Sequence, residues 1–225
     1  MFDAAQLNAQ PIIRKAPMEK LLSITWGKIL LQSWLAWSWI DGIVIEHARN
    51  DFATIGENPI EETLGYIFGS NISVVGESHR PLLEQSQVTK TLPFKFVDQL
   101  SLLLTPQEKL LAAVNYPFQP AVWKSWHGLF RKQERKAIPY SAFILTERQF
   151  LMIYEDADDT ESSFGTYIQS VKRKNIIDLL IENKLDGPQL ILLVSDKKAD
   201  ERIILPAPEE CFDEMIERFR LYFRQ

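Results

Sequence analysis

The chain has 225 residues, 46% of them hydrophobic, so it is long enough to bury one large core or two small ones. Its formal net charge of −5 argues against wholesale nucleic-acid binding, and its single cysteine, Cys211, excludes an internal disulfide and a cysteine-based zinc site. The first residues lack the basic and apolar regions of a signal peptide. We therefore expect a cytoplasmic protein and leave peripheral contact with a membrane open.

The first strongly apolar segment, residues 24–45, is long enough to span a bilayer. Lys28 and Asp41 lie inside it, and a charge within a spanning helix costs about 2.5–3.5 kcal/mol on insertion scales. Apolar residues alternate over parts of the segment, and Asp41-Gly42 is a hairpin signal. We therefore predict buried strands here, the later one at 42–46, rather than a membrane helix.

Two further segments carry helix-start signals. Asn58 can cap a helix over residues 58–68, with proline at its first position and acidic residues in its first turn. Residues 70–97 have no clear period and are interpreted as a connection between lobes. Thr105-Pro-Gln-Glu108 is a capping box, which predicts a helix that ends before Pro117.

The last third of the chain is typical of short strands closed by one helix. Residues 141–154 form two apolar runs around a polar Thr-Glu-Arg-Gln turn, which predicts a hairpin. Further β-rich runs lie at 167–182, 189–195 and 202–206, and the period then changes to that of a helix. One face of this helix carries Phe212, Ile216, Phe219 and Phe223, and Cys211 is predicted to lie on the same buried side.

The order of elements at 28–68 echoes that at 189–223. Each segment contains a strand, a turn, a strand and a proline-led acidic helix. Such an echo predicts a partial first copy and a full second copy of one unit. It lies in the order of elements rather than in identical residues, so two unrelated units stay equally open.

From Leu110 to Phe223 the pattern resembles the bacterial pleckstrin-homology-like (PH-like) domains. Residues 142–153 are similar to their second and third strands, 168–182 to the elements that follow, and 202–223 to their last strand and capping helix. The resemblance implies a strongly bent, seven-stranded antiparallel sheet or partly open barrel with a C-terminal helix. It implies an interaction or membrane-proximal role rather than catalysis.

We accordingly predict an α+β fold with two units. A smaller N-terminal α+β lobe would occupy residues 1–97, as a partial PH-like unit, and a PH-like domain would occupy 98–225. In lipid-binding relatives a basic loop between the first two strands holds the headgroup, and here that loop would be residues 117–139. It lacks the spaced Lys-x-Arg pattern of phosphoinositide binders, so no lipid specificity is carried over.

The strongest local signal for binding lies within that loop. Five cations against Glu134 give residues 123–136 a charge of +4, and aromatic residues alternate with them. Cations attract phosphates, and aromatic rings suit a membrane interface. Single-stranded nucleic acid would use the same chemistry, but the acidic remainder disfavours it. A solvated loop whose aromatics fold back on the core is the competing interpretation. The candidate contact residues are Trp123, Lys124, Trp126, Arg131, Lys132, Arg135 and Lys136.

Other charged clusters are interpreted as structural. The basic run 172–174 is typical of a solvated sheet edge. The acidic run 155–161 lacks the residue order of a calcium loop and predicts a solvated hairpin turn. His47, His79 and His127 are far apart, and no nucleophile-elbow or phosphate-loop motif is present. We predict no metal, no cofactor and no catalytic residue.

The sequence thus predicts a non-catalytic binding or scaffold protein that contacts a protein partner or an anionic membrane surface. Assembly into a homo-oligomer stays open. The alternative function is a small enzyme with its active site in a cleft between the two lobes. A pocket lined by coupled carboxylates or a histidine would favour the enzyme, whereas a rim of basic and aromatic residues would favour binding.

Overall fold

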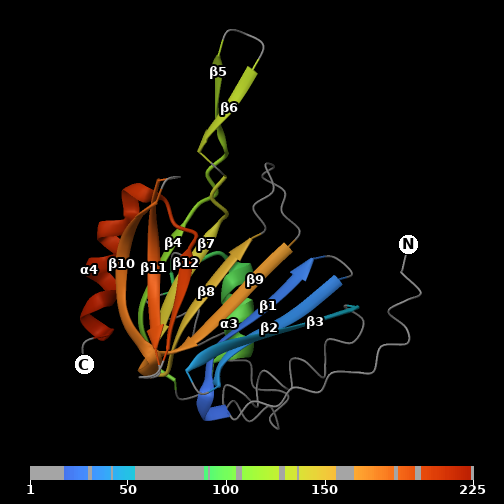
Figure 1. The fold of residues 1–225 in the computed structure, drawn as a ribbon, viewed down its shortest axis with the longest axis vertical. Helices are drawn as coiled ribbons and strands as arrows, with labels where there is room; N and C mark the ends of the chain where they lie inside the picture. The colour runs from blue at the N-terminus through green and yellow to red at the C-terminus, as the bar shows by residue number, and fades with distance from the viewer. Residues whose placement is uncertain are drawn as a thin grey trace.

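The computed structural model describes residues 18–29, 32–41, 43–53, 89–90, 92–104, 108–126, 130–135, 137–155, 165–184, 187–195 and 199–223. For 122–126 and 130–135 the backbone alone is described. Figure 1 shows two packed sheets, one helix beside the smaller sheet, one helix behind the larger sheet, and a long hairpin that projects from one end.

The larger sheet has seven antiparallel strands in the order β3-β2-β1-β9-β8-β7-β4. Its strands are β1 (Leu21–Ile29), β2 (Gln32–Asp41), β3 (Val44–Ala53), β4 (Leu110–Tyr116), β7 (Ser141–Thr146), β8 (Gln149–Glu155) and β9 (Gly165–Lys172). The smaller sheet contains β10 (Ile176–Lys184), β11 (Gly187–Ser195) and β12 (Asp200–Leu205). The projecting hairpin is β5 (Val122–Trp126) and β6 (Phe130–Arg135).

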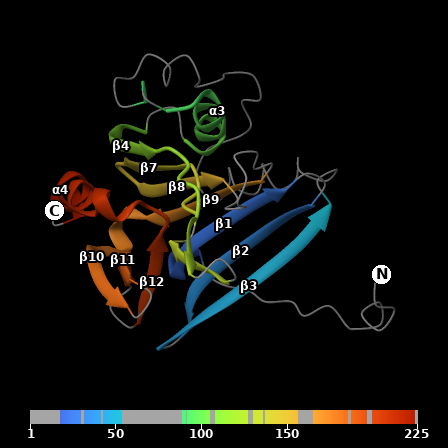
Figure 2. The ribbon, with the colours of Figure 1, turned by 90° about the horizontal axis from the view of Figure 1, so that it is seen from above.

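Two helices complete the described chain: α3 (Phe94–Leu103) and α4 (Phe212–Phe223). Short 3-10 turns are η2 (Met18–Lys20), η4 (Arg173–Asn175) and η5 (Glu209–Cys211). Figure 2 shows that α3 covers one face of the larger sheet, while the β10–β12 sheet and α4 lie on its other side.

The β7–β8 hairpin lies at the centre of the molecule and is buried on both faces. Phe143 and Leu145 belong to the core shared with the smaller sheet and α4, whereas Ala142 and Ile144 belong to the core beneath α3. All four side chains are fully buried. Because both faces are covered, the strand is a continuous apolar run instead of an alternating one. The predicted hairpin around the Thr-Glu-Arg-Gln turn is confirmed.

The helix α3 closes the second face with a single apolar stripe. Phe96 and Leu100 are fully buried, as is nearly all of Leu103, while Phe94 on the other side of the helix is exposed. The helix begins after Pro93 with no side-chain cap hydrogen bond. Its first turn lies in the stretch 70–97 that was interpreted as a connection, and the helix was missed because it lacks a Ser, Thr, Asp or Asn start signal.

The first apolar segment forms strands, as predicted. β1 and β2 pair along their length, and β2 pairs with β3 in a register that sets Asp41 opposite Val44. Among the described helices, none is long and apolar enough to cross a membrane.

The N-terminal strands extend the sheet of the C-terminal half, because β1 pairs with β9. The predicted boundary at residues 97–98 falls inside α3, and strands from both sides of it share one sheet. In the predicted echo, β2–β3 and β11–β12 are both hairpins, and α4 follows the second of them. The helix predicted at 58–68 lies outside the described residues.

The helix predicted from the capping box at 105–108 is wrong over residues 110–114. These residues begin β4, which pairs with β7. Ala112 and Val114 pack in one core and Ala113 in the other, so the period here is 2. Glu108 bonds to the sheet instead of capping a helix: its carboxylate accepts hydrogen bonds from Thr146 and from Gln149 Nε2. Tertiary burial therefore overrides the local helix signal.

The C-terminal helix α4 follows η5 and packs as predicted. Phe212 and Phe219 are buried, and Ile216 and Phe223 are partly buried against the same core. The half-buried Cys211, just before α4, packs against this core too.

Side-chain bonds hold α4 in place over the open end between the sheets. The Arg220 guanidinium donates to both carboxylate oxygens of Asp178 on β10, from Nε at 2.7 Å and from Nη2 at 2.6 Å. Arg218 donates to the carbonyl oxygen of Ala113 on β4 at 3.1 Å. A largely antiparallel sheet capped by a C-terminal helix is thus confirmed, although the described strands do not close into a barrel.

Phe219→Ala tests the packing of α4. Phe219 is fully buried and packs edge-on against Phe150, with ring centroids 5.2 Å apart. Its truncation should lower the free energy of unfolding by about 3–5 kcal/mol. Leu221→Ala on the exposed face of the same helix is the control and should change it by less than about 0.5 kcal/mol. Equal effects in denaturant unfolding would show that the helix face is assigned incorrectly.

Candidate functional site

The predicted binding segment forms the projecting hairpin, called here the arm (residues 119–138). At its root, the backbone amides and carbonyls of Gln119 and Ile138 exchange two hydrogen bonds, each 2.9 Å long. Beyond the root, β5 and β6 pair antiparallel and stand away from both sheets (Figure 1). The described residues of the arm therefore form a two-stranded ribbon with a register shift between Val122 and Trp123, where the sequence had predicted a loop.

The backbone register places most candidate contact residues on this ribbon. Trp123, Lys124 and Trp126 lie on β5, and Arg131, Lys132 and Arg135 lie on β6. Lys136 lies outside the described residues. Lys124 is directly opposite Lys132, and Ser125 is opposite Arg131.

This register distributes the cations over both faces of the arm, since successive residues of a strand lie on alternate faces. Like charges directly opposite one another weaken strand pairing. The pair Lys124 and Lys132 is such a case. The backbone also carries β5 away from both hydrophobic cores (Figure 1). The backbone path therefore favours a projecting ribbon over a loop that folds back on the core.

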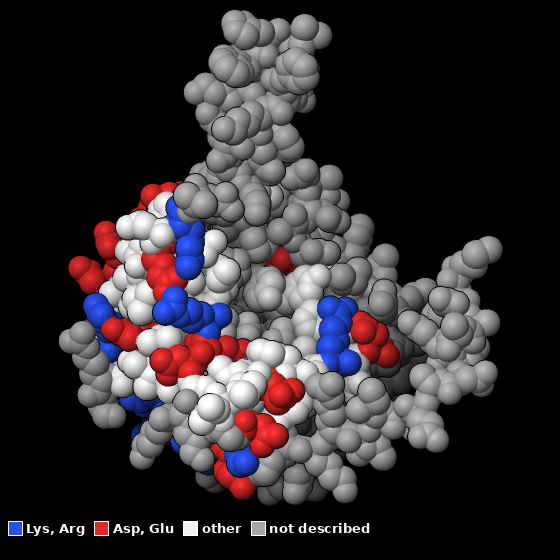
Figure 3. Space-filling view, in the orientation of Figure 1, with Lys and Arg blue, Asp and Glu red and all other residues white. Residues whose placement is uncertain are grey.

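The body of the protein offers a different surface. Figure 3 shows acidic and basic side chains interspersed over the smaller sheet and α4. Several are paired, as in the ion pair between Arg202 and Glu182 at 2.5 Å and that between Arg218 and Glu214 at 3.3 Å. On this face, the described residues thus form no broad single-sign patch.

A polar groove lies between β1–β3 and β12. Its described lining includes Thr25, Ser38, His47, Arg49, Gln169 and Glu201, around a volume of about 330 Å³. Ser38 Oγ donates to Glu201 Oε2 at 2.7 Å, and the Ser23 and Ser38 hydroxyl oxygens are 2.8 Å apart. His47 is directly opposite Ser38 in the strand register.

Burial dominates the electrostatics of this groove and raises the pKa of Glu201. The hydrogen bond from Ser38 and the proximity of His47 act in the opposite direction. In a nucleophilic triad, a histidine stands between the hydroxyl and the carboxylate. Here Ser38 donates to the carboxylate directly. The network therefore serves as a polar tie between the two sheets, and sequence reasoning missed it because Ser38 and Glu201 are 163 positions apart.

An aromatic row crosses the larger sheet above Gly27. The register places Trp34 on one side of Gly27 and Tyr167 on the other. The Trp34 and Tyr167 rings have centroids 5.5 Å apart, and Tyr154 stacks on Tyr167 at 5.2 Å. The Arg49 guanidinium lies 4.4 Å from the Trp34 ring, a cation–π contact. A Cβ at Gly27 would come within 2.2 Å of the Trp34 indole, so glycine leaves the space that the ring fills.

The basic run 172–174 does not lie at a sheet edge, contrary to the prediction. Lys172 ends β9, which has β1 on one side and β8 on the other. Arg173 and Lys174 occupy the turn η4, and Arg173 Nη2 donates to the carbonyl oxygen of Tyr222 at 2.8 Å. The sequence pattern predicted a sheet edge because β1, the strand that pairs with β9 on this side, is distant in sequence.

The remaining candidates carry little chemistry. Of the acidic run 155–161 only Glu155 is described, and it is buried and paired with Lys95. His79 and His127 lie outside the described residues. Within the part of the chain that the structure describes, no group of three His, Cys, Asp or Glu side chains could hold a metal ion.

The chain matches none of the protein-family models, curated proteins or solved structures with which it was compared. What its surfaces can do is therefore inferred from their own geometry and charge.

Gly27→Ala tests the aromatic row. The added methyl group would collide with the Trp34 ring, and such overpacking should cost about 1–3 kcal/mol of unfolding free energy. In a Trp34→Val background the same change should be neutral or stabilising, because alanine suits a strand better than glycine does. A double-mutant cycle in denaturant measures the coupling. Equal costs in both backgrounds would mean that Trp34 does not occupy this space.

Glu201→Gln tests the half-buried carboxylate. A raised pKa in the folded state means that the folded state binds the proton more tightly than the unfolded state does. The wild-type protein therefore loses stability as the pH rises from below 4.5, the ordinary pKa of a glutamate, through the raised pKa of Glu201 in the folded state. Glutamine can still accept the Ser38 hydrogen bond but does not titrate. The stability of the variant relative to wild type should grow between about pH 4 and pH 7. A constant or falling difference in urea unfolding would contradict the assignment.

Proposed function

We propose that the chain is a non-catalytic binding protein of PH-like fold that contacts an anionic membrane surface through its arm. The observation that carries the proposal is the arm itself, which projects from the body and holds four of the five candidate cations on its two short strands. A stable body with a projecting basic ribbon suits recognition of a surface.

The strand order supports the PH-like part of the proposal. From β4 onward, β4, β7, β8 and β9 form a four-stranded meander, and β10, β11 and β12 form a three-stranded one, followed by α4. Seven antiparallel strands followed by a C-terminal helix are what the resemblance implies. The arm is an insertion between the first two of these seven strands. The strands β1–β3 are an addition that pairs with the fourth, β9.

The position of the arm bears on the choice of partner. In lipid-binding relatives, the loop between the first two strands holds the headgroup, and in this chain that connection carries the arm. Each basic residue near an anionic surface contributes about 1 kcal/mol. The whole chain carries −5 and the arm +4, so an anionic surface would repel the body and attract the arm. This asymmetry would orient the protein arm-first.

The competing functions have weaker support. An acidic protein partner would be attracted by the same charges, so the choice of a membrane depends on the position of the arm in the connection that holds the headgroup in the lipid-binding domains. The enzyme alternative depends on the groove at Glu201 and His47. There the Ser38 hydroxyl donates directly to the Glu201 carboxylate, so no histidine relays between the hydroxyl and the carboxylate as it does in a nucleophilic triad.

Co-sedimentation with vesicles tests the proposal. Phosphatidylcholine vesicles that contain phosphatidylserine should pellet the protein, whereas pure phosphatidylcholine should not. Added salt should weaken the association, because the Debye length falls from about 10 Å at 0.1 M to about 3 Å at 1 M. A variant with Lys124, Arg131, Lys132, Arg135 and Lys136 changed to serine should remain in the supernatant.

A charge-matched variant is the control. It changes five basic residues on the body to serine and should pellet like the wild type; these are Arg49, Lys90, Lys109, Lys184 and Arg202, all exposed. Equal loss in both variants would indicate a response to net charge alone and would refute an arm-specific site. Failure of the wild type to pellet at low salt would leave the protein partner as the better proposal.

A further inference from the structure

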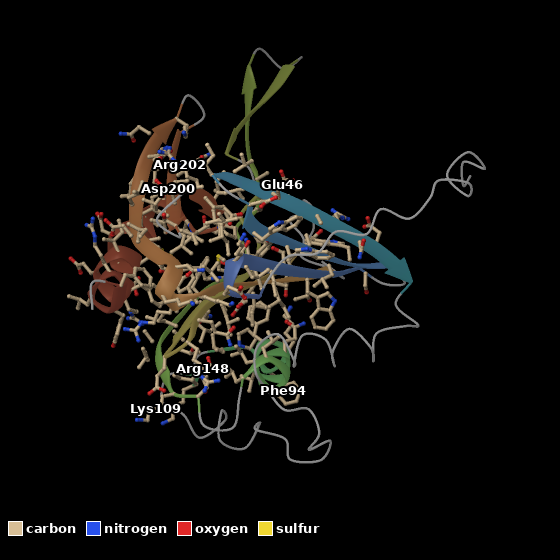
Figure 4. All side chains as sticks on the ribbon, turned by 60° about the horizontal axis from the view of Figure 1, so that its bottom comes forward. Glu46, Phe94, Lys109, Arg148, Asp200 and Arg202 are labelled. Atoms are coloured by element: carbon tan, nitrogen blue, oxygen red, sulfur yellow. The ribbon has the colours of Figure 1, made fainter. Side chains whose placement is uncertain are left out.

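A second pocket lies at the end of the β7–β8 hairpin that is remote from the arm. It has a volume of about 580 Å³, within the range of small-molecule sites. Four parts of the chain form its walls: the start of β1, the β7–β8 turn, the path from β9 through η4 into β10, and the end of α4. Figure 4 brings this end of the molecule forward, and Arg148 lies there between α4 and α3 in that view.

One side of this pocket is cationic. Arg148, Lys172, Arg173 and Lys174 line it, against the single carboxylate Glu147. Glu147 is 3.7 Å from the Nζ of Lys109, and Arg173 donates to the carbonyl oxygen of Tyr222. Among the described residues, no carboxylate forms an ion pair with Arg148 or Lys174. The four cations that line the pocket therefore outnumber its one carboxylate, and the pocket carries a net positive charge.

The positive charges of this cluster repel one another, and Lys172 is partly buried among them. Burial lowers the pKa of Lys172, the neighbouring Lys174 lowers it further, and Glu19 partly offsets both effects. A cluster of this kind is relieved when an anion binds between its members. The cluster is drawn from two separate turns, η4 and the β7–β8 turn, which the Arg173 backbone amide joins by a hydrogen bond of 2.7 Å to the Arg148 carbonyl oxygen. This bond fixes the spacing of the two basic turns.

The other side of the pocket is apolar. Leu22, Ile24 and Ile176 are buried but reach its inner wall, and the half-buried Phe223 closes it from α4. A hydrated inorganic anion would leave this wall uncovered. A ligand with an apolar body would cover it, and burying apolar surface contributes about 25 cal/mol per Å².

We propose that this pocket binds a small anionic amphiphile. Its phosphate, sulfonate or carboxylate group would lie between Arg148 and Lys174, and its apolar body would lie against Leu22, Ile176 and Phe223. The site is separate from the arm, which joins β7 at Ser141, whereas the pocket lies beyond Thr146 at the other end of that strand. Loss of one site should therefore leave the other intact.

The fluorescent probe 1-anilinonaphthalene-8-sulfonate combines an apolar ring system with one sulfonate and suits a direct test. Titration of the folded protein should give saturable binding at one site. The variant with Arg148→Ala and Lys174→Ala should bind it about tenfold more weakly or worse, because charge-assisted hydrogen bonds are lost. Both side chains are exposed, so the variant should fold, and its thermal unfolding checks this. The control Lys184→Ala with Arg202→Ala removes the same charge from the smaller sheet and should bind like wild type.

Competition separates the parts of the ligand. Monomeric dodecyl phosphate should displace the probe at concentrations at which inorganic phosphate and decanol do not. If inorganic phosphate displaces the probe equally well, the pocket does not need an apolar body in its ligand. If decanol displaces it equally well, the pocket does not need an anionic group. Equal affinities of the pocket variant and its control, or binding that does not saturate, would overturn the site. The serine variant of the arm should retain the probe, which keeps this result distinct from the vesicle test.

Discussion

The β7–β8 hairpin imposes the constraint on which the structure depends, because its side chains are apolar on both faces. Phe143 and Phe150 need a cover on one side, and Ile144 and Leu151 need another. The smaller sheet with α4 supplies the first cover, and α3 supplies the second. The bidentate bond between Arg220 and Asp178 then holds α4 over the gap between the sheets. Removal of either cover would expose the centre of the protein.

The same hairpin positions both candidate sites. The arm is inserted between β4 and β7 and so leaves the body at one end, while the basic pocket forms around the β7–β8 turn at the other. Neither site interrupts the apolar layers, because each lies where the strands end. The tie between Ser38 and Glu201 links the added strands β1–β3 to the smaller sheet. The two positive regions therefore lie at opposite ends of β7, on a chain whose net charge is −5.

The sequence predicted what depends on local pattern. The turn at 146–149, the strands within 24–45 and the stripe of α4 all have a clear period and clear turn or cap signals. The helix α3 was missed because it lacks a start signal. The helix predicted from the signal at 105–108 does not form over residues 110–114, because these residues pair with β7 in the sheet. The arm residues were found through their charge, but their ribbon geometry was not. The pocket cations come from two distant turns and the Ser38–Glu201 bond spans 163 positions, so neither leaves a motif.

We propose that recognition of an anionic membrane resides in the arm, and that the body folds without it. Replacing residues 120–137 with Asn-Gly would join Gln119 to Ile138 by a two-residue turn, which suits the hydrogen-bonded pair at the arm's root. The decisive measurement is vesicle binding by this shortened protein, beside its thermal unfolding. The account predicts an unchanged unfolding midpoint and no binding to anionic vesicles. Binding at the wild-type level, by a protein that still folds, would contradict it.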